Sequence, residues 1–318
     1  MLVANVYVIA LDVGGTFVKS AIVAPAGCLS QPTVTPIDSS ADAETILAAF
    51  ADIIHLHLAQ VDPVSLVGVA FGFPGPFDYE AGVSYITGVA KYEAIYGLNI
   101  KVALQSRLAE QADLTATLRE NLSGLTNLVF RNDAEAAIVG EARYGAGQPY
   151  RRLIGVTLGT GCGSAFIDEG TPVTSGEGVP LNGWLYPVLF RGVQADDSFS
   201  RRGLEARLRA ARATTLDVKE AATAARQGDA TTRQVFATFG ADLGSFLEPY
   251  AFSFQAQAVL VLGGIAGAFD LFGPTLRQAL SVPALPGERG ADAALLGAAD
   301  MLFRPLPLHI DQKLSISN

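Results

Sequence analysis

Two stretches of similar pattern decide the fold of this chain of 318 residues. Residues 8–23 read VIALDVGGTFVKSAIV, and residues 153–167 read LIGVTLGTGCGSAFI. Each has an apolar run, a turn rich in glycine and threonine, and a second apolar run. This pattern predicts a β-hairpin whose turn uses the permissive backbone of glycine. Because residues 12–16 align with residues 157–161, the repeat indicates two related lobes.

A weaker repeat follows each predicted hairpin. Residues 66–71 (LVGVAF) end at Gly72, and residues 259–262 (VLVL) end at Gly263, which is typical of buried strands that stop at a glycine corner. Apolar periodicity and composition predict helices over residues 42–60, 106–119, 231–254 and 291–303. The sequence therefore predicts an α/β protein with two similar lobes that face each other across a cleft.

The predicted lobes divide the chain near residues 122–128, which agrees with about 150 residues per domain. We expect an N-terminal lobe over residues 1–122 and a C-terminal lobe over residues 123–290. The last helix, within residues 291–318, is expected to pack back on the N-terminal lobe and complete it.

Composition excludes several classes of protein. Half of the residues are apolar and 17% are charged, whereas disordered chains have low hydrophobicity and high charge. A net charge of -9 argues against a nucleic-acid-binding surface, which is normally basic. We expect no membrane span, because no apolar run approaches ~20 residues. With two cysteines and no basic leader, the simplest expectation is a cytoplasmic protein.

Residues 12–16 (DVGGT) join a carboxylate at the end of a strand to two glycines and a hydroxyl. Glycine lets backbone N–H groups approach a phosphate, and Thr16 can donate to a phosphate oxygen. Asp12 can hold Mg²⁺ directly or through water. Residues 159–161 (GTG) form a second turn without a carboxylate. Either turn alone could be an ordinary hairpin turn. Two such turns favour phosphate binding, because a nucleotide that lies between two lobes needs one turn from each.

Asp133 has two interpretations. It stands where a helix is predicted to begin, so it could be a plain N-cap, for which aspartate is favoured. It could also be a general base that takes the proton from an alcohol as the alcohol attacks a phosphoryl group. Asn132 beside it could hydrogen-bond sugar hydroxyls. The residues alone leave both interpretations open.

Taken together, these motifs resemble the ROK family (repressors, open reading frames and kinases) of bacterial sugar kinases, within the actin-like ATPase superfamily. The resemblance extends from about Val6 to Leu302. Five stretches carry it: the first phosphate motif (residues 12–16), the sugar-side loop (72–76), the catalytic stretch (132–137), the second phosphate motif (158–163) and the adenosine-side motif (261–264).

The resemblance implies a two-lobed actin-like (ribonuclease H-like) fold and an ATP-dependent phosphotransferase with Mg²⁺. Its acceptor would be a hexose hydroxyl, glucose at its 6-hydroxyl by default, and Asp133 would be the base. A homodimer is also implied. The implied ATP-binding residues are Asp12, Gly14, Gly15, Thr16, Gly159, Thr160, Gly161, Gly263 and Gly264. The implied sugar-binding residues are Gly75, Asn132, Asp133 and Glu177.

The chain departs from the family where many members have a Gly-Glu-x-Gly-His element and a cysteine-rich zinc motif. No histidine lies between His57 and His309, and no cysteine follows Cys162, so no zinc site is expected. Residues 175–178 (SGEG) would make Glu177 the sugar carboxylate, whereas residues 182–184 (NGW) are a rival alignment with no acid. The sugar, and the donor (ATP or polyphosphate), stay open.

Three alternative functions belong to the same fold. A non-catalytic sugar or nucleotide sensor is favoured by the missing element and opposed by Asp133 and the two turns. A DNA-binding repressor would need a helix-turn-helix segment, for which the residues before the first strand give no room. An actin-like structural ATPase would need a polymerising surface.

The segment around Lys91 is rich in tyrosine. These tyrosines could form a lip over the sugar, or they could belong to an ordinary surface segment.

Overall fold

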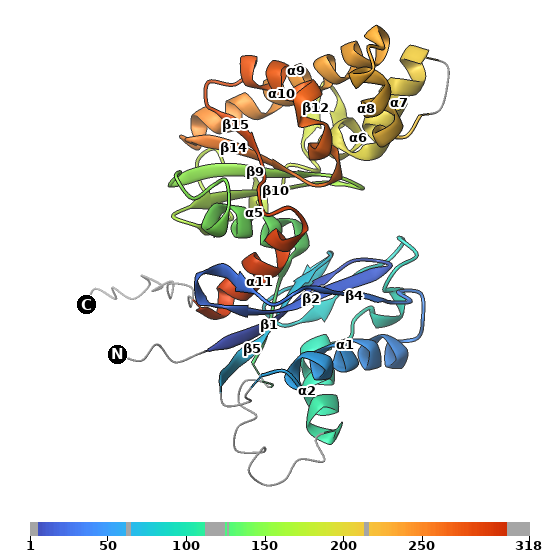
Figure 1. The fold of residues 1–318 in the computed structure, drawn as a ribbon, viewed down its shortest axis with the longest axis vertical. Helices are drawn as coiled ribbons and strands as arrows, with labels where there is room; N and C mark the ends of the chain where they lie inside the picture. The colour runs from blue at the N-terminus through green and yellow to red at the C-terminus, as the bar shows by residue number, and fades with distance from the viewer. Residues whose placement is uncertain (1–5, 62–64, 112–124, 126, 213–215, 304–318) are drawn as a thin grey trace, which may run out of the picture.

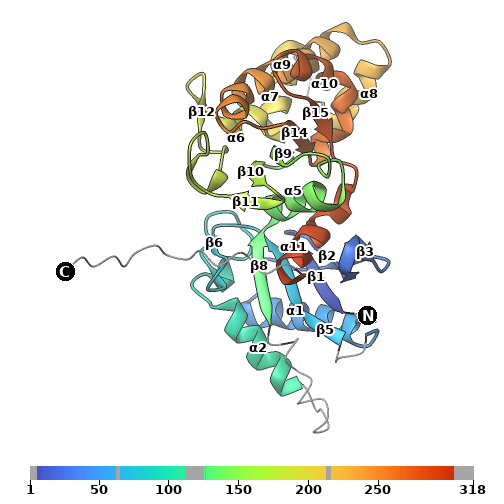
Figure 2. The same ribbon diagram turned by 90° about the vertical axis from the view of Figure 1, so that its left-hand side faces the viewer.

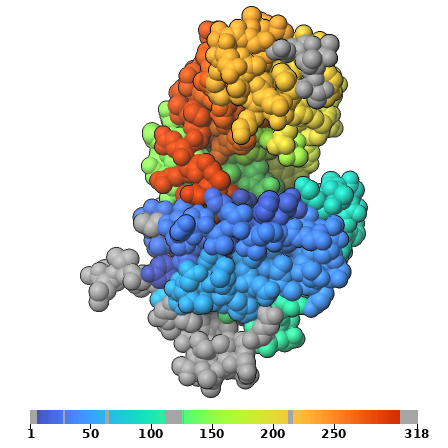
Figure 3. Space-filling model, turned by 45° about the vertical axis from the view of Figure 1, so that its right-hand side comes forward, coloured from blue at the N-terminus to red at the C-terminus, as the bar shows by residue number. Residues whose placement is uncertain are grey.

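The computed structural model describes residues 6–61, 65–111, 125, 127–212 and 216–303, and it consists of two lobes stacked along the long axis (Figure 1). Each lobe is built on its own β-sheet. Two helices, α5 (Asp133–Tyr144) and α11 (Ala293–Phe303), lie between the two sheets (Figures 1 and 2). On the surface, blue and cyan atoms fill one lobe and yellow and orange atoms the other (Figure 3).

The sheet of the first lobe has the strand order β3-β2-β1-β5-β8, and β4 pairs with β2. Strands β1 and β2 form the predicted antiparallel hairpin, whereas β5 and β8 run parallel to β1. The strands are β1 (Tyr7–Val13), β2 (Phe17–Ala24), β3 (Cys28–Leu29), β4 (Thr33–Pro36), β5 (Leu66–Phe73) and β8 (Leu128–Asn132). The carboxyl ends of β1, β5 and β8 therefore meet at one edge.

The sheet of the second lobe repeats this plan in the order β11-β10-β9-β14-β15. Strands β9 and β10 form the second hairpin, and β14 and β15 follow in parallel with β9. The strands are β9 (Arg152–Leu158), β10 (Cys162–Asp168), β11 (Thr171–Val173), β14 (Ala258–Leu262) and β15 (Ala284–Pro286). Both predicted hairpins and the repeated α/β fold class are thus confirmed.

Helices cover both faces of each sheet. The outer helices of the first lobe are α1 (Ala43–Leu58) and α2 (Ile100–Gln111). Those of the second lobe are α6 (Ala195–Phe199), α7 (Arg201–Arg212), α8 (Val218–Arg226), α9 (Ala230–Ser253) and α10 (Phe269–Gln278). The short elements include β6 (Phe77–Asp78), β7 (Val83–Ser84), β12 (Leu189–Phe190), β13 (Val193–Gln194) and the 3₁₀ turns η3 (Glu93–Ile95), η4 (Leu181–Gly183) and η5 (Gly264–Ala268).

The helices predicted over residues 42–60, 231–254 and 291–303 are confirmed as α1, α9 and α11. The helix predicted over residues 106–119 begins earlier, at Ile100, because the Asn99 side chain accepts a hydrogen bond from the Val102 N–H (2.9 Å) and caps it. Its residues after Gln111 lie outside the described part of the chain. In that described part, no helix is long and apolar enough to cross a membrane.

Helices α5 and α11 cross at very close range. A Cβ at Gly140 would overlap the backbone of Ala293, and a Cβ at Gly297 would overlap the backbone of Ala136. Helix α11 also packs on β1 and β5. The last helix therefore contacts the sheet of the first lobe. The exact division into residues 1–122 and 123–290 stays a proposal, because most of residues 112–126 lie outside the described part.

Candidate active site

Strand register brings the first predicted site residues together. Asp12, near the end of β1, pairs with Gly72 on β5, and Phe73 at the end of β5 pairs with Asn132 at the end of β8. A Cβ at Gly72 would lie 3.8 Å from Oδ1 of Asp12. Ligands of open parallel sheets bind outside the carboxyl ends of the strands, so this edge is the expected place for a site.

The first glycine turn is held from outside by two side chains. The Tyr92 hydroxyl donates to the Gly14 carbonyl (2.6 Å), and the Ser39 hydroxyl donates to the Gly15 carbonyl (2.5 Å). The Gly14 N–H donates to the Phe17 carbonyl (3.0 Å), and Thr16 is exposed. The carbonyls of the turn are thus occupied, which suits a loop that presents its remaining backbone donors to an anion.

Asp12 lies in a setting that disfavours its negative charge. The pKa of Asp12 is raised to about 6, mainly by burial and next by the nearby charge of Asp133, although Lys19 lowers it. Lys19 itself is paired with Asp292 (2.5 Å). Two carboxylates therefore stand close enough to repel each other at the edge of the sheet. A bound cation would stabilise both of them in the ionised form.

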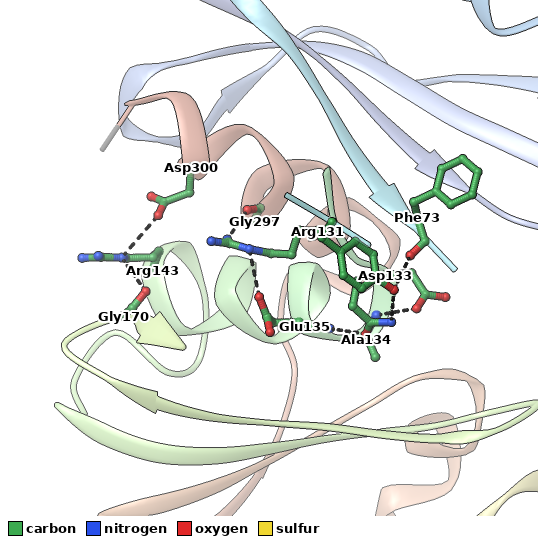
Figure 4. A network of polar contacts seen from close by, with 11 residues as sticks. Phe73, Arg131, Asp133, Ala134, Glu135, Arg143, Gly170, Gly297 and Asp300 are labelled. Carbon is green, nitrogen blue, oxygen red and sulfur yellow. Dashed lines mark hydrogen bonds and ion pairs between the residues drawn. The ribbon is translucent and has the colours of Figure 1, made fainter. Parts of the chain in front are cut away.

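Asp133 is the first residue of α5 and lies among the contacts drawn in Figure 4. The N-cap of this helix is Asn132, whose side-chain oxygen accepts from the Glu135 N–H (3.2 Å). One oxygen of Asp133 accepts from the Ala134 N–H (2.8 Å), and burial raises the pKa of the carboxyl group. Because Asn132 caps the helix, the interpretation of Asp133 as a plain N-cap loses its support.

The predicted sugar-side residues meet beside Asp133. The Asn132 amide donates to the Tyr79 hydroxyl (3.0 Å), and the Tyr79 hydroxyl donates to the Phe73 carbonyl (3.2 Å). A Cβ at Gly75 would lie 3.0 Å from the Tyr79 hydroxyl oxygen, so Gly75 leaves the space that Tyr79 fills. Burial and the charge of Asp133 raise the pKa of Tyr79, which keeps it a neutral donor.

The second glycine turn lies against the start of the same helix. A Cβ at Gly163 would overlap the Cβ of Ala134, so the first residues of β10 touch α5 next to Asp133. Within the turn, the Gly159 N–H donates to the Gly161 carbonyl (3.0 Å). Thr160 is exposed. The second hairpin thus touches the start of α5, the same end of the helix at which Asp133 lies near Asp12 of the first hairpin.

The predicted adenosine-side glycines end β14, next to β9. Gly263 has φ of 85°, and a Cβ there would overlap the backbone of Leu158, so both its conformation and its packing require glycine. A Cβ at Gly264 would meet nothing within 4 Å. The structure therefore brings these glycines to the carboxyl edge of the second sheet, beside the second turn.

Glu177 does not join this group in the part of the chain that is described. It is exposed, and its neighbour Gly178 packs against Ser253 at the end of α9. By contrast, Ser164 fixes the rival segment: its hydroxyl donates to the Gly183 carbonyl (2.7 Å) and accepts from the Leu185 N–H (2.8 Å). The role of Glu177 in binding sugar stays a prediction.

A largely buried ionic network joins α5 to α11 (Figure 4). Arg131 donates to the Gly297 carbonyl (2.7 Å) and pairs with Glu135 (3.1 Å), and Arg143 pairs with Asp300 (3.7 Å). Removing one partner of such a pair leaves an uncompensated buried charge, which is strongly destabilising. The network therefore fixes α5 to α11 and holds the start of α5 in place.

Sequence reasoning missed how the segment between β7 and α2 is used. Tyr92 is buried and reaches the first turn, and Lys91 lies across Gly15. Tyr85 and Tyr96 are exposed with ring centroids 6.2 Å apart, as an ordinary surface segment would be. The aromatic cluster around Lys91 was the signal in the sequence, but its two interpretations, a sugar lip or an ordinary surface segment, did not include a contact with the phosphate motif.

Within the described ranges, no group of three or more His, Cys, Asp or Glu side chains could hold a metal ion. Asp12 is thus a candidate ligand only for a metal ion that takes most of its ligands from water and substrate. Mg²⁺ at nucleotide sites keeps several waters and binds through one or two carboxylates and substrate phosphates, so Asp12 fits it.

Two lobes of equal strand order, with a glycine turn from each beside one helix start, define a protein of the actin-like ATPase fold class. The chain belongs to the ROK family, whose model matches residues 8–181. It is 24% identical over 327 residues to the glucokinase of Thermotoga maritima, with 92% of this chain and 96% of that protein covered.

Two solved structures show how widely the fold is used. The ROK family glucokinase from Streptomyces griseus, in complex with glucose and AMPPNP, superposes with a TM-score of 0.70 at 23% identity, covering 93% of this chain and 98% of that one. A ROK family transcriptional regulator, a homologue of the E. coli MLC protein, gives 0.72 at 16% identity, covering 94% and 78%. A likeness of the fold therefore does not separate kinase from regulator.

Proposed function

We propose that this protein is a sugar kinase that transfers the γ-phosphoryl group of MgATP to a hydroxyl of a hexose. One observation carries the proposal: the half-buried Asp133 stands at the start of α5, beside Asn132, where Asp12 of the first hairpin and Gly163 of the second both come close. Glucose, at its 6-hydroxyl, is the first acceptor to test, because the relatives named above include glucokinases.

In this proposal Asp133 takes the proton of the acceptor hydroxyl. A general base works best when its pKa lies near the working pH, and burial moves the pKa of Asp133 in that direction. Asn132 and the backbone at Gly75 would position the sugar, since both lie beside the Tyr79 hydroxyl and Asn132 precedes Asp133. Glu177 would supply the family's sugar carboxylate, whereas the rival alignment at residues 182–184 supplies none.

The phosphate groups would lie between the two turns. Backbone donors and Thr16 from the first turn and Thr160 from the second would hold them, while Gly263 and Gly264 would leave room for the nucleoside. Asp12 would hold Mg²⁺, whose charge offsets that of the phosphates. Phosphoryl transfer needs mainly positioning and charge stabilisation, which a pair of closing lobes can supply. A cytoplasmic location and a homodimer complete the proposal, on the resemblance alone.

A coupled assay that follows ADP formation over a panel of hexoses, amino sugars and acetylated sugars tests this function. We expect turnover with at least one sugar, and a loss of about 10²-fold or more in kcat for Asp133→Asn. Asp52→Asn, an exposed aspartate on α1, is the matched control and should keep wild-type turnover. Near-normal turnover by Asp133→Asn would remove Asp133 from the role of base.

A sugar or nucleotide sensor without catalysis is the second candidate. It is favoured by the Asn182-Gly183-Trp184 segment, which has no acid where the rival alignment places the family's glutamate. The same panel should then be run with ATP and with polyphosphate as donor, together with calorimetry of sugar binding. Sugar binding without product from either donor would favour the sensor over the kinase.

A further inference from the structure

Lys91 is held in a fixed position above the first glycine turn. Its neighbours Ala90 and Tyr92 both have left-handed backbone conformations, with φ of 54° and 57°, which residues other than glycine rarely adopt. Such strain persists only where the surroundings impose it, and it is frequent at functional sites. Here the Ala90 N–H donates to the Glu93 carboxylate (2.9 Å), and the Tyr92 N–H donates to the Ser39 carbonyl (2.6 Å).

The side chain of Lys91 lies directly on Gly15. The Cε and Nζ atoms of Lys91 are each 2.6 Å from the position that a Cβ at residue 15 would occupy. Any side chain at residue 15 would therefore displace the ammonium group. Gly15 thus has two functions: it lets backbone N–H groups approach an anion, and it leaves the space that the ammonium group of Lys91 fills.

Lys91 is also an available charge. Lys19, the other lysine near this edge, is paired with Asp292 and only 19% exposed. Lys91 is exposed, and within the described residues it forms no ion pair. An exposed ammonium group on the glycine turn that follows Asp12 suits a polyphosphate chain. The cation would offset the negative charge of the incoming phosphates.

We propose that Lys91 binds the terminal phosphate of the phosphoryl donor at the first glycine turn. The inference rests on the proposed function for the identity of the donor, but the anion site itself does not require turnover. The alternative is that Lys91 only covers Gly15 and contributes packing. An uncharged side chain of similar length separates the two, because it keeps the packing and removes the charge.

The experiment compares Lys91→Met, Lys91→Arg and the wild type. Isothermal titration calorimetry with inorganic tripolyphosphate, at low and at high salt, reads the anion site without any sugar. We expect Lys91→Met to bind about 10-fold more weakly and with a smaller salt dependence. We expect Lys91→Arg to stay within about 3-fold, because arginine keeps the charge. Lys219→Met, an exposed lysine on α8, is the matched control and should bind as the wild type does.

Each outcome decides the question. Equal tripolyphosphate binding by Lys91→Met and the wild type, or no binding by the wild type, overturns the inference. Weaker binding by Lys91→Met in a protein that phosphorylates none of the sugars supports the anion site while contradicting the kinase. Where turnover is present, the ATP KM should rise about 10-fold in Lys91→Met. Thermal melting of the variants checks that all of them are folded.

Discussion

The two hairpin turns occupy equivalent places in the two lobes, yet they differ in charge. The first turn follows Asp12 and has Lys91 lying on it, while Tyr92 holds one of its carbonyls. The second turn has Thr157 at the position equivalent to Asp12. Two copies of one supersecondary unit thus supply two sets of backbone donors. Within the described residues, only the first hairpin has a carboxylate of its own, Asp12, and a lysine without an ion pair lying on its turn.

A carboxylate does stand at the second turn, but it acts differently. Asp196, in α6, accepts from the Cys162 N–H (2.7 Å) and pairs with Arg202 (2.5 Å). Its charge is therefore already compensated, and it occupies one of the backbone donors that a phosphate would use. For the proposed kinase we therefore expect the metal at the first lobe, and phosphate contacts without a metal at the second.

The largest expected effect comes from substituting Asp12, compared with substituting Thr157 at the equivalent position of the second hairpin. Asp12→Asn should lower kcat about 10²-fold or more, because the site loses the carboxylate that would hold the metal. Thr157→Val, at the equivalent position of the second hairpin, should change kcat less than about 3-fold. Steady-state kinetics with the best sugar of the panel, over a range of Mg²⁺ concentrations, measures both.

A loss of activity in Asp12→Asn that excess Mg²⁺ fully restores would agree with weakened metal binding. Equal losses in the two variants would contradict the assignment of the metal to one lobe.

A smaller effect is expected on stability and its pH dependence. Because the pKa of Asp12 is raised from 3.8 to about 6, the folded protein binds a proton more tightly there than the unfolded chain does. The contribution of Asp12 to the free energy of unfolding should therefore fall as the pH rises from about 4 to about 6, and stay level above. The variant Asp12→Asn has no such charge to bury. Without nucleotide or Mg²⁺ it should therefore be about 3 kcal/mol more stable than the wild type at pH 8.

Urea unfolding at pH 4.5 and pH 8 measures that difference. The gain in Asp12→Asn should shrink at the lower pH, whereas Asp52→Asn should differ little from the wild type at either pH. A gain of equal size at both values would show that burial of the Asp12 charge is not its cause.

Local patterns were enough to predict the two hairpins, three of the four helices and the strand ends that bear Asp12 and Asn132. These features depend on periodicity and on glycine at turns, which a sequence displays directly. The start of α2 was missed because the Asn99 cap outweighs the periodicity that indicated a later start. The choice between Asn132 and Asp133 as N-cap was open because adjacent residues with similar capping preference differ by one position in the helix.

Contacts between segments far apart in the chain could not be predicted in the same way. The position of Lys91 over Gly15 depends on Ser39 and Tyr92 together, which no local pattern relates. Glu177 matched the local motif, yet an exposed loop packed against α9 carries it. Motif spacing therefore finds the groups on strand ends more reliably than those on long loops.

The smallest expected effect concerns the support of the first turn, for which the second turn has no tyrosine equivalent among the described contacts. Tyr92→Phe removes the hydrogen bond from the buried hydroxyl to the Gly14 carbonyl and keeps the ring that packs near Phe50 and Phe73. Loss of one hydrogen bond should lower the free energy of unfolding by about 1 kcal/mol. It should also raise the ATP KM a few-fold, because the turn and Lys91 lose a restraint. Tyr96→Phe, on the exposed part of the same segment, should change neither value. If Tyr92→Phe lowers stability but leaves the ATP KM unchanged, the tyrosine supports the fold of the first lobe and has no part in aligning its phosphate turn.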